Sequence, residues 1–447
     1  MNTVNLQGMT RKLSIRISIL TISLLSYVIL PAQTLQDRMM NDPKAGASIF
    51  RPYSFEPGAD VSVPEGYRPF YISHFGRHGS RYYSQPKSWQ QAIDCFASAH
   101  AQGQLTAEGE ALYSAMKTIY NAHDGMYGEL APLGAVEHRQ IAGRMYHRER
   151  KVFASKKRNK VRCASSVYSR CIMSMANFTE ELSSLVPEME VSYTAGKRYN
   201  DEYLNSPLGH DFNGEANRIL DSLKRADLDP TALLSLYFRD AEKAAGQVNA
   251  PYEVEMGIFY FWAISHDLDF LGVDMTPLIP LDELAKCSAI DNAAKYAKVA
   301  VSEEFGKYTG VKGMNLLNDF VVKADDALRQ DSDVAADLRF AHDSAFLPMC
   351  SLLGIKGYPT CSVEDAYGNW NAADAVPMCA NLQMVFYSGR GDVLVKVLVN
   401  EKVAVLDDIT PVQGSFYRWS DIRSRIEGLK DTYHRTENNS QINQLYE

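Results

Sequence analysis

Short apolar runs that end in polar turns alternate along the chain with longer stretches of helical periodicity. The run that begins at Arg68 carries Phe70, Ile72 and Phe75, residues typical of a buried strand, before a polar turn. Similar runs predict strands at Val161–Ser165, Glu188–Thr194, Leu338–Ala341, Ala380–Tyr387, Val393–Val399 and Val403–Leu406. Helical periodicity predicts helices at Ser88–Ala101, Thr106–Ala122, Pro132–Phe153, Ser169–Leu185, Asn315–Arg329 and Ser415–Tyr433.

The order of these elements predicts an α/β fold with a mostly parallel sheet flanked by helices. From about residue 196 to 310 the chain changes character, because helical stretches dominate and strand patterns are rare. We interpret 196–310 as a mainly helical cap inserted between two parts of the α/β core, residues 33–195 and 311–435. The proline- and glycine-rich segment before Arg68 is expected to lie on the surface, and the polar residues 436–447 are expected to form a flexible tail.

The N-terminus has the pattern of a cleaved secretory signal, residues 1–32. Arg11, Lys12 and Arg16 precede a mostly apolar run that ends before Ala32. This run is shorter than the roughly 20 apolar residues of a membrane span, so no stable span is expected after cleavage. The sequence therefore predicts a periplasmic or secreted protein.

The mature chain is acidic, which argues against nucleic acid as a partner. The formal net charge is −8, and removing the three cations of residues 1–32 makes it more negative still. Seven cysteines leave at least one thiol free, and Cys361 and Cys379, which flank a loop-like segment, are the best candidates for a disulfide. No spacing is typical of a zinc site, so neither a metal nor another cofactor is expected.

The strongest chemical signal is the segment Arg77-His78-Gly79-Ser80-Arg81, directly after the first predicted strand. Planar guanidinium groups match the oxygens of a phosphate group. A neutral imidazole between them can attack phosphorus near neutral pH. Gly79 would let the backbone turn sharply and approach a ligand. A surface turn with solvated charges is the alternative interpretation of this segment alone.

Two further strand-to-helix segments carry charged residues at the matching position. One contains Arg170 after the predicted strand Val161–Ser165, and the other contains His342 and Asp343 after Leu338–Ala341. Because ligands bind at the carboxyl ends of parallel strands, one site could collect all three segments.

Together these segments resemble the signature of the histidine acid phosphatases, the second branch of the histidine phosphatase superfamily. The resemblance implies that His78 is the nucleophile and that Asp343 gives a proton to the leaving group. It implies a phosphate pocket made by Arg77, Arg81, Arg170 and His342. The expected partner is a small phosphate ester.

The expected activity is hydrolysis of phosphate monoesters of the phytate, inositol phosphate or sugar phosphate type through a phosphohistidine. Tyr82 after Arg81 resembles the multiple inositol polyphosphate phosphatases. Those enzymes usually have His-Ala-Glu where this chain has His342-Asp343-Ser344, and proline in place of Tyr83. Two alternatives are a non-catalytic exported protein that binds an anion and a phosphomutase of the first branch.

Three other histidines are interpreted as structural. His266-Asp267 repeats the His-Asp pair, but it follows an aromatic helical stretch and is expected to mark a helix end. His123 likewise falls at a predicted helix terminus. His74, inside the first strand, is expected to be satisfied by neighbouring groups.

Overall fold

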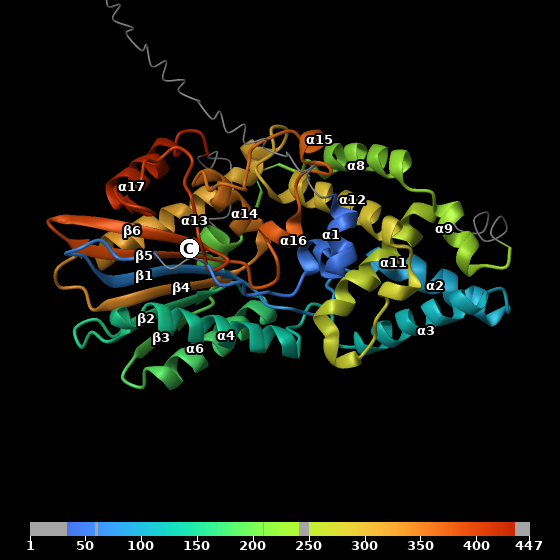
Figure 1. Ribbon diagram of the computed structural model, residues 1–447, viewed down its shortest axis with the longest axis horizontal. Helices are drawn as coiled ribbons and strands as arrows, with labels where there is room; N and C mark the ends of the chain where they lie inside the picture. The colour runs from blue at the N-terminus through green and yellow to red at the C-terminus, as the bar shows by residue number, and fades with distance from the viewer. Residues whose placement is uncertain (1–33, 59–60, 209, 241–249, 434–447) are drawn as a thin grey trace, which may run out of the picture.

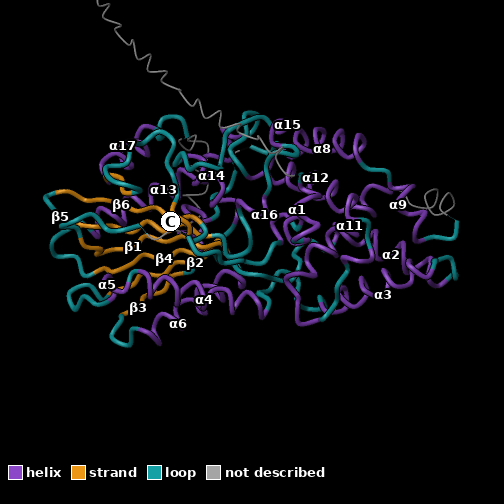
Figure 2. The backbone as a smooth tube through the Cα atoms, viewed as in Figure 1, coloured by secondary structure: helices purple, strands orange, loops and turns teal. Residues whose placement is uncertain are grey.

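All strands lie in one mixed sheet on one side of the molecule (Figures 1 and 2). The computed structural model describes residues 34–58, 61–208, 210–240 and 250–433. Within them the strand order is β3-β2-β4-β1-β5-β6-β7, and β8 pairs with β6. The strands are β1 Arg68–Arg77, β2 Lys160–Ser165, β3 Glu190–Thr194, β4 Val334–Ala341, β5 Asn381–Gly389, β6 Asp392–Val399, β7 Lys402–Val403 and β8 Phe416–Arg418.

The sheet confirms the α/β class and has two halves. Strands β3, β2, β4 and β1 are parallel to one another, whereas β5 and β6 are antiparallel to their neighbours. The β5–β6 connection is a two-residue turn in which Arg390 and Gly391 have φ of 50° and 79°. Positive φ at both turn residues matches the twist of a tight hairpin. The antiparallel half is therefore a local hairpin unit added to the parallel half.

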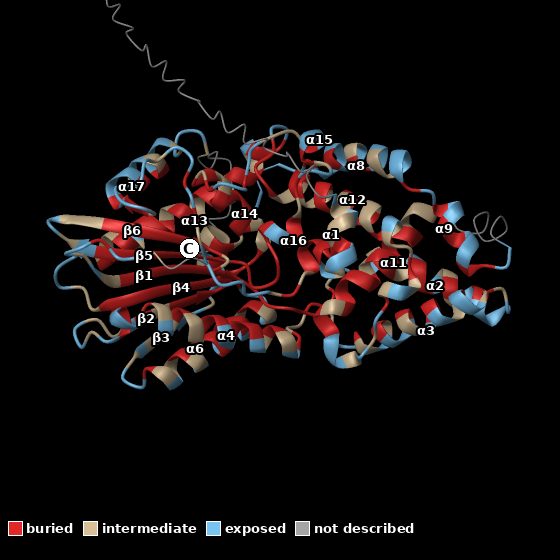
Figure 3. Ribbon diagram, viewed as in Figure 1, coloured by how far each residue is buried: buried red, intermediate tan, exposed pale blue. Residues whose placement is uncertain are grey.

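Both faces of the sheet are covered, and the central strands are buried along most of their length (Figure 3). Leu382, Met384 and Phe386 of β5 face one hydrophobic cluster, as their alternation predicts. Val385 and Tyr387 between them face the other cluster. Strand β4 is likewise buried along its whole length, and it is apolar except for Asp337 and Arg339.

Helices make up the rest of the fold. The long helices are α2 Lys87–Ala101, α3 Ala107–Ala122, α4 Pro132–Arg148, α6 Ser169–Leu185, α8 Asn213–Asp227, α9 Pro230–Tyr237, α11 Pro251–Ser265, α12 Leu281–Val299, α13 Gly306–Ala327, α14 Asp343–Leu352 and α17 Trp419–Gly428. Shorter ones are α1 Leu35–Asn41, α5 Arg150–Phe153, α7 Lys197–Tyr199, α15 Val363–Ala366 and α16 Ala372–Ala375. Short 3-10 or π segments are η1 Pro43–Gly46, η2 Ser48–Phe50, η3 Asn200–Leu204, η4 His266–Leu271 and η5 Thr276–Leu278.

A helical region lies beyond the carboxyl ends of the parallel strands (Figure 1). Helix α2 packs on α11, where the rings of Trp89 and Phe261 stack with centroids 4.1 Å apart. A Cβ on Gly257 of α11 would lie 2.7 Å from the Cβ of Ala92, so glycine is needed for this close approach. The helical region thus draws on residues 87–122 as well as on 196–310, and the division into core and cap remains a prediction.

Some elements differ from the sequence-based predictions. Helix α17 is shorter than Ser415–Tyr433, because residues 416–418 pair with β6 as β8. The segment before β1 is not confined to the surface, since residues 45–50 are buried and Ile49 and Phe50 join the main core.

Both ends of the chain fall outside the described residues, so the predicted signal and tail remain predictions. No helix in the described part of the chain is long and apolar enough to cross a membrane.

Candidate active site

The first motif and the His-Asp motif meet because β1 and β4 are adjacent and parallel. Arg77, the last residue of β1, pairs with Ala341, the last of β4, and the His78 N–H donates to the Ala341 carbonyl at 2.9 Å. His78 and His342, each just after its strand, then face one another with ring centroids 5.6 Å apart. Asp343 follows as the first residue of α14.

The third motif joins them from β2, on the other side of β4. The Ser166 N–H donates to the Phe340 carbonyl at 2.9 Å, and the Ser166 hydroxyl lies 3.1 Å from Nε2 of His342. Helix α6 begins three residues later and carries Arg170 in its first turn. The charge of Arg170 is close enough to lower the pKa of His78 after burial and Arg77. The structure therefore brings all six predicted site residues into one cluster.

His78 is held as a neutral imidazole with a defined tautomer. Its Nδ1 lies 3.0 Å from the carbonyl oxygen of Gly79, which can only accept, so Nδ1 carries the hydrogen. Nε2 then keeps its lone pair. Burial, followed by Arg77, Arg170 and Arg81, lowers the pKa of His78 well below its ordinary value. A buried neutral imidazole with a free Nε2 is a competent nucleophile.

Arg77 and Arg81 are buried and Arg170 is half-buried, and among the described residues no carboxylate forms an ion pair with any of the three. Nη1 of Arg77 donates to the carbonyls of Ile49 and Val376 at 2.8 and 2.7 Å, and Nη1 of Arg81 donates to Tyr82 at 2.9 Å. In the part of the chain that the structure describes, Nε of Arg77, Arg81 and Arg170 is buried and has no hydrogen-bond partner. Three unsatisfied guanidinium donors suit an anion with several oxygens.

Mutual repulsion accompanies this arrangement. Burial, then Arg170 and Arg77, lowers the pKa of Arg81 to about 10. Burial also lowers the pKa of Arg77, although Asp343 and Asp267 oppose the shift. Bringing a phosphate dianion into the cluster would relieve this repulsion.

Asp343 is half-buried, yet the groups around it keep it ionised. Burial raises its pKa, but Arg77, Lys295, His342 and Arg81 together lower it below the ordinary value. Burial and Arg170 lower the pKa of His342 to about 3, so His342 is neutral. The arginines thus prevail over burial in setting the charge of Asp343, a balance that the sequence left open.

The backbone N–H groups of the motif loop, residues 77–83, donate their hydrogen bonds to side chains and to backbone carbonyls of the protein. Gly79 donates to the Ser174 hydroxyl at 3.1 Å, Ser80 to Oε2 of Glu137 at 2.8 Å, and Arg81 to Oδ2 of Asp267 at 3.3 Å. Phosphate recognition is therefore left to the side chains of the loop. This differs from a glycine-rich loop whose N–H groups cradle a phosphate.

Glycine is required at position 79 for packing rather than for approach to a ligand. A Cβ there would lie 2.7 Å from Cα and O of Gly134, and a Cβ on Gly134 would lie 2.3 Å from the Ser80 carbonyl. The two glycines let the motif loop press against the first turn of α4. The expected sharp turn at Gly79 does not involve positive φ.

Sequence reasoning missed Glu137 and Asp267. Glu137 had no signal, because a single glutamate on a helix is ordinarily a surface residue. Asp267 belongs to the His266-Asp267 pair, which does follow the end of α11 as predicted. Its carboxylate nevertheless reaches the motif loop and is completely buried.

Two histidine interpretations have different outcomes. His123 is structural: its Nε2 accepts from the Tyr83 N–H at 2.8 Å and its Nδ1 donates to the Ile119 carbonyl at 2.7 Å. His74 is not satisfied as expected, because neither ring nitrogen has a partner among the described residues. Its ring packs between Phe178 and Phe340, so its contribution is to packing.

The predicted disulfide is wrong. Both thiols are free: Cys361 Sγ lies 3.2 Å from the hydroxyl of Tyr296, whereas Cys379 Sγ lies 3.4 Å from Oε2 of Glu137. The two sulfur atoms therefore contact different residues and are not bonded to each other. Among the described residues no three His, Cys, Asp or Glu side chains gather in a way that could hold a metal ion.

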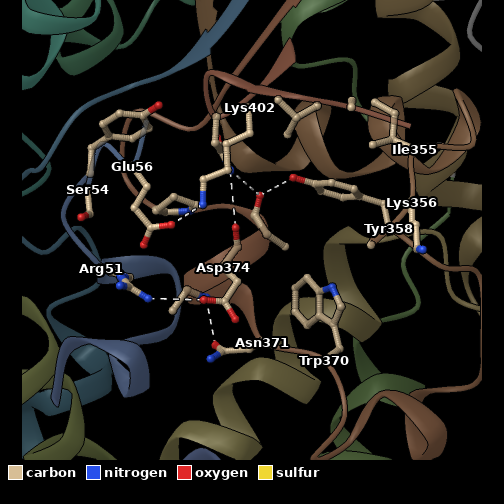
Figure 4. A pocket seen from close by; sticks show the side chains of 18 of the residues that line it. Arg51, Ser54, Glu56, Ile355, Lys356, Tyr358, Trp370, Asn371, Asp374 and Lys402 are labelled. Carbon is tan, nitrogen blue, oxygen red and sulfur yellow. Dashed lines mark hydrogen bonds and ion pairs between the residues drawn. The ribbon is translucent and has the colours of Figure 1, made fainter. Parts of the chain in front are cut away.

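A cavity of about 650 Å³ lies elsewhere, between the N-terminal segment, residues 355–358 and 369–377, and the β6–β7 hairpin (Figure 4). None of the six predicted site residues lines it. Most of its charged groups already pair, such as Arg51 with Asp374 at 3.3 Å and Lys402 with Glu56 at 2.5 Å. The motif cluster, whose cations lack such partners, is the candidate active site.

The solved structures that resemble this chain include an inositol polyphosphate phosphatase and a phytase. The Bifidobacterium longum multiple inositol polyphosphate phosphatase in complex with inositol hexasulfate matches with TM-score 0.71 and 20% identity, over 86% of this chain and 97% of that one. The same enzyme with phosphate matches with TM-score 0.70 and 20% identity, over 89% and 99%. The phytase from D. castellii matches with TM-score 0.63 and 14% identity, over 89% and 86%.

No protein-family model matches the sequence, and no curated protein matches it. At the identities above, the structural similarity establishes the fold. The chain therefore has the fold of the histidine acid phosphatases, as its three motifs predict. Within that fold, the structures named here are those of an inositol polyphosphate phosphatase and a phytase.

Proposed function

We propose that this protein is an exported phosphomonoesterase that acts through a phosphohistidine intermediate. The observation that carries the proposal is the state of His78. It is neutral, its Nδ1 is fixed by the Gly79 carbonyl, and its Nε2 is free beside arginines whose Nε atoms have no partner in the described residues. An in-line nucleophile and positive charge on the phosphoryl oxygens are what phosphoryl transfer needs.

In the first step Nε2 of His78 attacks phosphorus, so the N–P bond forms while the ester P–O bond breaks. Arg77, Arg81 and Arg170 hold the phosphoryl oxygens, with His342 beside them. Asp343 gives its proton to the leaving alkoxide. In the second step Asp343 takes a proton from water, the water oxygen bonds to phosphorus, and the N–P bond breaks to release phosphate.

The charge of Asp343 links this mechanism to pH. Without substrate its pKa is below the ordinary value because of the cations around it. A bound phosphate dianion offsets those cations, which favours the protonated acid that the first step needs. Because protonated Asp343 becomes scarcer as the pH rises, activity on alkyl phosphates is greatest under acidic conditions.

The substrate is a small organic phosphate of the inositol phosphate or sugar phosphate type. Lys295 of α12 and Lys312 of α13 add positive charge near Asp343. Lys295 helps to lower the pKa of Asp343, and Lys312 is half-buried with Asn205 at 3.4 Å as its hydrogen-bond partner. Additional cations favour a substrate that carries more than one phosphate. The names of the similar structures support the same class.

The test is release of inorganic phosphate from a panel of inositol hexakisphosphate, glucose phosphates and p-nitrophenyl phosphate across acidic and neutral pH. Acid quenching with labelled substrate should trap phosphate on the wild-type protein but not on His78→Ala. A folded wild-type protein that binds phosphate but hydrolyses no member of the panel would instead indicate the alternative, an exported anion-binding protein.

A further inference from the structure

Two buried carboxylates hold consecutive backbone groups of the motif loop. Glu137 of α4 accepts the Ser80 N–H at 2.8 Å, the Ser80 hydroxyl at 2.9 Å and the Tyr53 N–H at 2.7 Å. Asp267 of η4 accepts the next amide, Arg81, at 3.3 Å. Glu137 is thus saturated with donors and fixes Ser80 firmly.

Asp267 differs from Glu137 in both origin and saturation. It comes from the helical region, directly after α11, and its exposed fraction is 0%. Its Oδ1 is buried and has no hydrogen-bond partner within the described residues. Since an unsatisfied buried carboxyl oxygen is costly, packing alone would not favour Asp at this position.

Asp267 also lies among the charges of the site. Burial and Glu137 raise its pKa well above the ordinary value, whereas the Arg81 amide and the Arg81 charge oppose this. It is close enough to Arg77 and Cys379 to affect their pKa values as well. The groups that face it are therefore Glu137, Arg77, Arg81 and Cys379.

We infer that Asp267 is a positioning residue of the phosphate site: by accepting the Arg81 N–H from the helical region, it sets the direction in which the Arg81 side chain leaves the loop. It touches no reacting atom and acts through Arg81. This inference rests on the proposed function and adds a connection between the helical region and the phosphate-binding side chains.

The experiment compares Asp267→Ala, Asp267→Asn and the control Asp269→Ala in the full-length protein. Asp269 is exposed two residues further along the same turn. The readouts are kcat and KM for the best substrate and competitive inhibition by inorganic phosphate. Asp267→Ala should weaken phosphate inhibition by roughly 2- to 10-fold, the loss expected when one ordinary hydrogen bond no longer holds the Arg81 backbone. Asp267→Asn retains an acceptor oxygen and should rescue most of the inhibition.

The expected losses appear mainly in KM and in phosphate inhibition, with a smaller effect on kcat, because His78 and Asp343 remain in place. Phosphate inhibition of Asp267→Ala equal to that of wild type would overturn the inference. So would an Asn variant as weak as the Ala variant, since charge rather than position would then matter. Either result leaves the proposed hydrolysis intact, because wild-type turnover tests that separately.

If Asp267→Ala fails to fold, Asp267→Leu takes its place, because leucine has nearly the shape of aspartate and offers no acceptor to the Arg81 N–H. Phosphate inhibition of Asp267→Leu equal to that of Asp267→Asn would contradict the positioning role.

Discussion

Two clusters of charged residues, the Arg339–Asp319 pair and the cluster of Arg77, Arg81 and Arg170, lie at the same sheet and behave in opposite ways. In the middle of the sheet Arg339 is 1% exposed, and its Nε lies 2.5 Å from Oδ2 of Asp319. Burial opposes its charge, yet Asp319 raises its pKa above the ordinary value. At the end of the sheet Arg77 is equally buried at 1%, but its hydrogen-bond partners are backbone carbonyls and its pKa is lowered.

The comparison separates structural charge from functional charge. Arg339 has its counter-charge within the fold, so its energy is part of the stability of the native state. Arg77, Arg81 and Arg170 form a cluster whose counter-charge, in our proposal, is the substrate. The electrostatic repulsion within such a cluster is relieved when an anion binds. For this reason, groups with shifted pKa values are common at functional sites.

The largest effect should follow from removing the nucleophile at the end of the sheet. We expect His78→Ala to lower turnover by at least about 10⁴-fold, as loss of a nucleophile does in other enzymes. Thermal stability should change little. His74→Leu is the matched control, because His74 is a buried histidine of β1, four residues before His78, and packs against phenylalanines. Turnover by His78→Ala at the wild-type rate would refute the proposed mechanism.

Next in size is the effect of Asp343→Asn, which should depend on the leaving group. An alkoxide leaving group needs the proton of Asp343, and general acid catalysis is typically worth about 10²–10⁴-fold. A nitrophenolate is a better leaving group and needs it less. Rapid-quench measurement of the first step should therefore show a far larger loss with an alkyl phosphate than with p-nitrophenyl phosphate. Equal losses would mean that Asp343 does not act as the acid.

The sequence predicted the end of the sheet better than the helical region. The sequence shows directly which charged residues follow a predicted strand, namely Arg77, His78, Arg170 and His342. Parallel strands bring their strand-to-helix turns to one edge of the sheet, so these residues could be placed together. Asp267 could not be identified in this way, since its partner is a backbone N–H far away in the chain. A hydrogen bond between distant segments leaves no periodic pattern in the sequence.

The lack of a local pattern for contacts between distant segments also explains two other outcomes. The Arg339–Asp319 pair was not predicted, and the predicted Cys361–Cys379 disulfide is wrong. Arg339 and Asp319 look like ordinary charges of a strand and a helix, and only the packing of α13 against β4 makes them a buried pair. Cys361 and Cys379 flank one segment, but the Cys361 thiol lies against Tyr296 and the Cys379 thiol against Glu137. Local spacing gave no information about either arrangement.

A third prediction concerns the middle of the sheet, where removal of charge should affect stability. We expect Asp319→Asn to lower the free energy of unfolding by about 3–5 kcal/mol, because it leaves Arg339 buried without its counter-charge. Arg81→Ala should leave stability unchanged or slightly increased, since it removes repulsion from Arg77 and Arg170. Urea unfolding of both variants is the measurement. Similar destabilisation by the two substitutions would remove the distinction between the clusters.

The smallest expected effect combines both clusters in one measurement, the stabilisation of the folded protein by inorganic phosphate. A ligand that binds only the folded state at 100 times its dissociation constant adds about 2.7 kcal/mol. The wild-type protein should show this increment.

Arg81→Ala should lose most of this increment, because one of the buried guanidinium donors is gone. Asp319→Asn should start from a lower stability but keep the full increment, because in the part of the chain that the structure describes Asp319 hydrogen-bonds to Arg339 and Tyr199 and to no residue of the phosphate site. Sodium chloride at matched ionic strength controls for general screening, which acts on exposed charges far more than on buried ones. If the increment survives in Arg81→Ala, phosphate binds outside the motif loop. If it disappears in Asp319→Asn, the two clusters are not independent.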